Sequence, residues 1–147
     1  MKFEKFAKKT GAHGKIVKAH GYSFLVKDEV AAVIPDFALN FYQITKAEES
    51  AVLNGVMNDF DIDELVRVAE LNRAIVTEAD GSTNAIRRIF CDHNGKEVSI
   101  SNDAFGLLEK KDSVFTGTVD IDDERTVNYL VVIKNQDIVG VIFQNLI

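Results

Sequence analysis

The segment AIRRIFCDHNGKEVSIS, residues 85–101, contains the clearest structural signal in this chain. Two short stretches rich in β-branched and aromatic residues flank the dipeptide Asn94-Gly95. Asn-Gly in this setting is a strong hairpin signal, because a type I′ turn needs positive φ at both of its central residues. The sequence therefore predicts an antiparallel strand pair over residues 85–92 and 96–101, joined by a two-residue turn.

Further strand-like segments lie on both sides of this hairpin. They are short, rich in β-branched and aromatic residues, and separated by turn-forming residues. Pro35 cannot donate to a sheet, so we expect it to close the third strand. Residues 36–44 fit a strand and a helix equally well. The predicted strands cover residues 14–21, 22–29, 30–35, 74–80, 113–120, 125–134 and 138–145.

Four segments have helical patterns. Residues 2–11 place apolar residues on one side and end at Gly11, while Thr45 with Glu48 and Asp61 with Glu64 are capping pairs that predict helices over 45–57 and 61–71. Ser101 is expected to cap a helix over residues 102–111. Together the patterns predict a single α+β domain over residues 1–147, mainly antiparallel β-sheet with about four short helices.

Composition narrows the functional class. The chain of 147 residues is acidic, with a net charge of −6, and its apolar fraction of 46% is that of a water-soluble globular protein. A single cysteine, Cys91, cannot form an internal disulfide, so we expect a cytoplasmic protein. No apolar run approaches the ~18 residues of a membrane span, and none follows the basic start, so we expect neither membrane insertion nor a signal peptide.

The charges are distributed unevenly. Residues 1–20 carry +5, which leaves −11 on the remainder of the chain. Such asymmetry is typical of a docking surface for an anionic partner, although a solvated helix that keeps the chain soluble has the same pattern. The candidate partner-binding residues are Lys2, Lys5, Lys8, Lys9, Lys15 and Lys18.

Motifs for catalysis or ligand binding fail on spacing. The run Gly11–Lys15 contains GxxGK without the following hydroxyl and helix of a phosphate-binding loop. His13, His20 and Cys91 lack zinc spacing. The acids of residues 59–70 resemble a calcium loop, but Glu64 stands where glycine is needed, and helix capping explains them as well. We therefore expect no enzyme activity, no cofactor and no metal.

Arg87 and Arg88 are adjacent on a predicted strand, so their side chains should point to opposite faces. On that basis we expect one of them to form an ion pair over the sheet.

Three segments, KFAKKTGAHGKIV (5–17), LNRAIVTEADGSTNAIRRIF (71–90) and SISNDAFGLLEKKD (99–112), resemble an uncharacterised family of small proteins from phages and prophages of gut Firmicutes. The resemblance implies a host cytoplasm and a phage-related role. The order of elements from residue 84 onward also resembles the second half of a DNA sliding-clamp domain. The helices of clamps are basic, whereas residues 61–71 here are acidic, so encirclement of DNA is not expected.

These observations lead to two functional expectations. The first is a non-enzymatic phage or prophage binding protein, an accessory of phage DNA replication or recombination that acts through its basic N-terminal segment. The alternative is an inhibitor or sponge directed against a host defence system, acting through its acidic remainder. The partner is a protein or a nucleic acid, and a homo-oligomer is compatible with either role.

Overall fold

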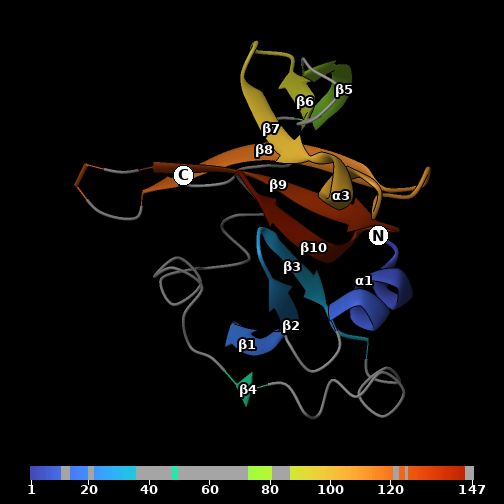
Figure 1. Ribbon diagram of the computed structural model, residues 1–147. Helices are drawn as coiled ribbons and strands as arrows, with labels where there is room; N and C mark the ends of the chain where they lie inside the picture. Colours follow the sequence, from blue (N-terminus) through green and yellow to red (C-terminus); the bar gives the residue numbers. More distant parts are fainter. Residues whose placement is uncertain are drawn as a thin grey trace.

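Ten strands form one sheet in the computed structural model, which describes residues 1–10, 14–19, 22–35, 48–49, 73–80, 87–120, 123–124 and 126–144. The strand order is β4-β1-β2-β3-β10-β9-β8-β5-β6-β7, and the neighbours are antiparallel except for β1 and β4 (Figure 1). The strands are β1 (Lys15–Ala19), β2 (Tyr22–Lys27), β3 (Val30–Val33), β4 (Glu48–Glu49), β5 (Arg73–Asp80), β6 (Arg87–Asp92), β7 (Glu97–Ser101), β8 (Ser113–Asp120), β9 (Thr126–Lys134) and β10 (Asp137–Phe143).

Two helices accompany the sheet in the described part of the chain, α1 (Phe3–Thr10) and α3 (Asn102–Phe105). The mainly antiparallel α+β character is thus confirmed, whereas the prediction of about four helices is not. The helix expected over 102–111 stops after one turn, because the N–H of Gly106 closes it onto Asn102 and the chain then turns at the buried Leu107.

Glu48–Glu49 form strand β4, where the sequence predicts the first turn of a helix over 45–57. Their backbone pairs in parallel with Lys15 and Ile16 of β1, and this tertiary pairing overrides the local capping signal. The rest of that helix, the helix expected over 61–71 and the ambiguous residues 36–44 lie outside the described residues.

The central strands are buried on both faces. Along β9, Leu130 and Val132 point into one apolar cluster, while Tyr129 and Val131 point into another on the opposite face. This explains why the sequence of β9 is a nearly continuous apolar run, as expected of a strand without a solvent face.

The first apolar cluster is enclosed by the helices and by the curvature of the sheet. Phe6 and Ala7 of α1 and Ala104 of α3 pack in it together with side chains from both ends of the sheet, including Leu25 of β2 and Val98 of β7. Strand β7 has therefore curled back toward the first strands. Figure 1 shows α1 and α3 on the same side of the molecule.

The free edge of β7 is covered by side chains. The N–H of Ser99 donates to Oε1 of Gln144 at 3.1 Å, and the N–H of Ser101 donates to Oε1 of Glu29 at 2.9 Å. Glu29 lies in the turn between β2 and β3, and Gln144 follows β10. These bonds tie the last strand in the sheet order to its middle and satisfy donors that an open edge would leave available for pairing.

The hairpin predicted around Asn94-Gly95 is present, but its turn differs from the prediction. The N–H of Asp92 donates to the carbonyl of Lys96 at 3.0 Å, so three residues form the loop, and only Gly95 among them has positive φ, at 83°. A three-residue loop with glycine in the left-handed region is the second common way to join two antiparallel strands. A turn with two positive φ angles occurs instead at Asn135 and Gln136, between β9 and β10.

Candidate binding surface

Helix α1 separates its lysines from its apolar residues. Phe6, Ala7 and Thr10 are buried against the sheet, and a helix with 3.6 residues per turn places the remaining positions toward solvent. The exposed basic residues of the segment are Lys2, Lys5, Lys8 and Lys9. Four of the six predicted partner-binding lysines therefore lie together at the surface. Lys15 and Lys18 belong to β1, and their side chains lie outside the described residues.

The lysines of α1 reach the neighbouring helix α3. Nζ of Lys9 lies 3.7 Å from Oδ2 of Asp103, and Nζ of Lys5 donates to the carbonyl of Gly106 at 3.4 Å. Lys9 and Asp103 are largely exposed, so their pair contributes little to stability. These contacts nevertheless join both helices into one continuous surface.

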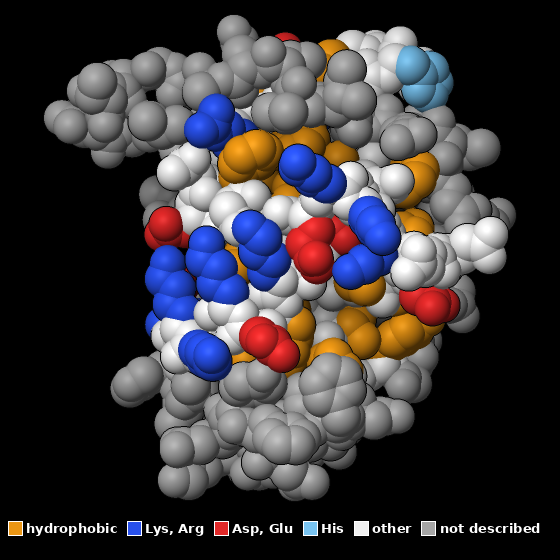
Figure 2. All heavy atoms as spheres, turned by 90° about the vertical axis from the view of Figure 1, so that its right-hand side faces the viewer, with side chains coloured by type: hydrophobic (Ala, Val, Ile, Leu, Met, Phe, Trp, Pro, Cys, Tyr) orange, Lys and Arg blue, Asp and Glu red, His pale blue; other side chains and the backbone are white. Residues whose placement is uncertain are grey.

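We name this surface the α1–α3 face. It is made of the exposed or half-exposed residues Lys2, Glu4, Lys5, Lys8, Lys9, Arg88, Asn102, Asp103 and Phe105. Five cationic side chains stand against two carboxylates, so the face is basic although the chain as a whole is acidic. Figure 2 shows Lys and Arg side chains gathered on the side of the molecule that carries α1 and α3.

Arg88 joins this face from β6. Its Nε donates to Oδ1 of Asn102 at 3.2 Å, and its guanidinium carbon lies 4.8 Å from the centre of the Phe105 ring. The amide and the ring both restrict the guanidinium, and the cation–π contact contributes roughly 0.5–1 kcal/mol at such an exposed site. The sequence led us to expect an ion pair over the sheet for Arg87 or Arg88. The contacts found for Arg88 are instead a hydrogen bond to Asn102 and a cation–π contact with Phe105.

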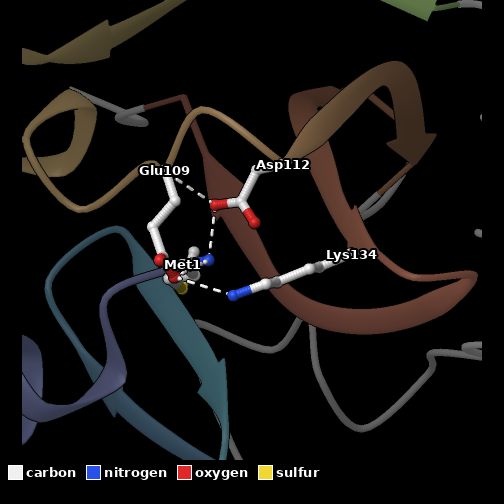
Figure 3. A network of polar contacts seen from close by, with 4 residues as sticks. All are labelled: Met1, Glu109, Asp112 and Lys134. Carbon is white, nitrogen blue, oxygen red and sulfur yellow. Dashed lines mark hydrogen bonds and ion pairs between the residues drawn. The ribbon is translucent and has the colours of Figure 1, made fainter.

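The N-terminal amine holds the start of α1 in place (Figure 3). The amine pairs with Oδ2 of Asp112, whose side chain is 1% exposed, and lies 3.1 Å from Oε1 of Glu109. Nζ of Lys134 approaches the same oxygen of Glu109 at 3.5 Å. The N–H of Lys2 donates to the carbonyl of Leu107 at 2.6 Å, so the backbone is fixed as well. We call Met1, Glu109, Asp112 and Lys134 the N-terminal clamp.

The clamp changes the acidity of Glu109. The hydrogen bond from the N-terminal amine lowers the pKa of this carboxyl, burial acts in the opposite direction, and attraction to the amine and to Lys134 lowers it further. Glu109 is therefore held in its charged form, which keeps the amine paired.

The GxxGK run has a structural role at its second glycine. A Cβ on Gly14 would overlap the Thr10 side chain and would lie 2.8 Å from Cδ1 of Leu25, so glycine allows α1 to pack against β2. Lys15 then begins strand β1, as the sequence predicts. Residues 11–13 lie outside the described part of the chain.

The described residues do not bring the other candidate ligand-binding residues together into a site. Within the residues that the structure describes, no group of three or more His, Cys, Asp or Glu side chains is placed to hold a metal ion. Cys91 is half-buried on β6, and its thiol donates to the carbonyl of Asp92 at 3.4 Å. His13, His20 and the acids of residues 59–70 lie outside the described residues. None of the described helices is long and apolar enough to cross a membrane.

Sequence reasoning found the lysines but missed Arg88, Asn102 and Phe105 as part of the same face. Their position depends on the register of the hairpin: the three-residue loop pairs Arg88 with Ile100, directly before Ser101 caps α3, whereas the two-residue turn expected from the sequence would have paired Arg88 with Ser101. One helical turn then brings Phe105 over the arginine.

No protein-family model, no curated protein and no solved structure matches this chain.

Proposed function

We propose that this chain is a non-enzymatic binding protein of a phage or prophage, which docks an anionic partner on its α1–α3 face. The observation that supports the proposal is the set of exposed lysines on α1, because they are concentrated on a helix that the N-terminal clamp fixes to the rest of the fold. Because the backbone of α1 is already fixed, binding has to order only the lysine side chains and not the helix that carries them, which favours association with an anion.

The role in phage DNA replication or recombination is the finer form of this proposal, and so is the location in a host cytoplasm. Both come from the resemblance of the three sequence segments to phage proteins. Docking through the acidic remainder onto a host defence protein is the competing proposal, and it predicts no loss of binding when the lysines are changed.

The first prediction uses a sulfated polyanion, immobilised heparin, which carries charge but no bases. The chain should be retained at about 50 mM salt, and Lys8→Gln should elute at lower salt, since each lost anion contact weakens the electrostatic part of binding. Lys96→Gln is the matched control. It removes one positive charge from the position directly before β7, about 20 Å from α3 at the usual strand rise, and should elute with the wild-type protein.

Equal shifts for the two variants would show that net charge alone is responsible and would contradict docking on the α1–α3 face. Flow-through of the wild-type protein at low salt would overturn the proposal and leave the acidic remainder as the better candidate surface. Thermal unfolding of each variant verifies that the exchange leaves the fold intact.

A further inference from the structure

Arg88 provides the α1–α3 face with a flat, oriented surface. Its guanidinium carbon lies over the Phe105 ring, 4.8 Å from the ring centre, and its Nε donates to Asn102 at 3.2 Å, while both Arg88 and Phe105 stay partly exposed. A planar guanidinium supported by an aromatic ring is a surface on which nucleobases stack.

The lysines next to this platform are arranged in a row. Lys2, directly before α1, and Lys5 and Lys9 within it follow each other at spacings of three and four residues, which puts them on one stripe along the helix. The stripe is about 10 Å long at 1.5 Å per residue. That length corresponds to about three phosphates of a stacked strand at ~3.4 Å each.

The contacts between the two helices place the row beside the platform. Lys9 pairs with Asp103 and Lys5 reaches Gly106, and these two residues flank Phe105 within the α3 segment. We infer that the anionic partner is a single-stranded nucleic acid, with its phosphates on the lysines of α1 and a base stacked on the guanidinium of Arg88. This inference rests on the proposed function, because it identifies the partner of the same face.

The net charge of the chain favours a single strand over a duplex. The face itself includes Glu4 and Asp103, and the whole chain carries −6. A duplex has about twice the charge density of a single strand, so this net charge repels it more strongly, whereas one strand can follow the lysine row. The carboxylates of an acidic protein segment would pair with the lysines, but such a segment has no base to stack on the guanidinium of Arg88.

The test compares a labelled oligothymidine of about 15 nucleotides with an abasic strand of equal length, which keeps the phosphates and lacks the bases. Fluorescence anisotropy should show the oligothymidine binding about tenfold more tightly, the effect of roughly one stacked base. Arg88→Lys keeps the charge but removes the plane, so it should abolish this difference. Phe105→Leu keeps an apolar side chain against the core, releases the guanidinium and should act in the same direction.

Three outcomes overturn the inference. Equal affinity for the oligothymidine and the abasic strand would show that no base stacks on Arg88. Docking of polyanions on the α1–α3 face would be unaffected by that result. Tighter binding of a duplex than of a single strand would show that the preferred partner is double-stranded nucleic acid. Competition by polyglutamate at equal charge concentration would favour an acidic protein. If the chain is retained on heparin but shows no preference for a strand with bases, this inference fails and the proposed function stands. The proposed function requires only the charge of the face.

Discussion

At the scale of single residues, Gly117 and Tyr129 form the tightest complementary pair in the described sheet. They face each other across β8 and β9, and the buried Tyr129 ring lies directly over the glycine. A Cβ on Gly117 would overlap ring atoms of Tyr129. The glycine is therefore required by the packing of its partner, since its φ lies outside the positive region.

The prediction at this scale is that Gly117→Ala lowers the free energy of unfolding by about 1–3 kcal/mol, because overpacking displaces the ring from its rotamer. Tyr129→Leu alone should also destabilise, through the cavity that it leaves. The double variant should be more stable than the sum of the two losses predicts, as measured by urea unfolding. Simple additivity would contradict a contact between the new methyl group and the ring.

At the scale of elements, the hairpin of β6 and β7 depends on Asp92. Its buried carboxylate accepts from the Thr116 hydroxyl at 2.7 Å and from the N–H groups of Asn94 and Lys96 at 2.8 and 3.0 Å. Burial alone would raise the pKa of Asp92, but these hydrogen bonds and attraction to His93 outweigh it, so the pKa lies below its ordinary value. Asp92 thus shapes the turn and fastens it to β8.

A carboxyl whose pKa is depressed in the folded state stabilises the protein above its unfolded pKa, and this stabilisation is lost as the pH falls through the folded value. Asp92→Asn should therefore lower the free energy of unfolding by about 1.5–3 kcal/mol at pH 7. The difference in unfolding free energy between the wild type and the variant should become smaller below about pH 4, near the ordinary pKa of aspartate. Denaturant unfolding between pH 3 and pH 7 provides the measurement. If this difference in unfolding free energy did not change with pH, the negative charge of Asp92 would be excluded as its cause.

The element scale also shows how far the sequence predicts this molecule. Strands with two apolar faces or a clear turn signal were predicted to within a few residues, as at Ser113–Asp120. The turn at Asn94-Gly95 was assigned the wrong type because the Asp92 carboxylate accepts from the N–H groups of Asn94 and Lys96 and so stabilises a longer loop, and a non-local bond from Thr116 holds that carboxylate in place. β4 was missed because two residues gain their strand conformation only from pairing with β1. The lysines could be found from charge alone, whereas the Arg88–Phe105 pair depends on register.

At the scale of the whole molecule, two groups of contacts hold distant parts of the chain together. Glu29 and Gln144 cover the edge of β7, and the N-terminal clamp joins residue 1 to the loop before β8 and to the end of β9. Both groups enclose the apolar cluster that contains α1. The orientation of the α1–α3 face is therefore a property of the complete fold.

The last prediction concerns the clamp. Asp112→Asn leaves the buried amine with Glu109 as its remaining carboxylate partner, and should lower the free energy of unfolding by about 2–3 kcal/mol. Glu109→Gln should cost less, because about a third of that side chain is exposed to solvent (34%). Thermal and urea unfolding at pH 7 give both values. A larger loss for Glu109→Gln than for Asp112→Asn would contradict the assignment of Asp112 as the main partner.

Extending the chain by Gly-Ser before Met1 tests the amine itself. The extension moves the charge away from Asp112, so it should destabilise the wild-type protein about as much as Asp112→Asn does. In the Asp112→Asn background the same extension should cost far less, because the pair is already broken. An extension that costs the same in both backgrounds would show that crowding, and not the ion pair, is responsible. Since the clamp fixes α1, the extended protein should also elute from heparin at lower salt than the unextended chain, although none of its lysines has changed.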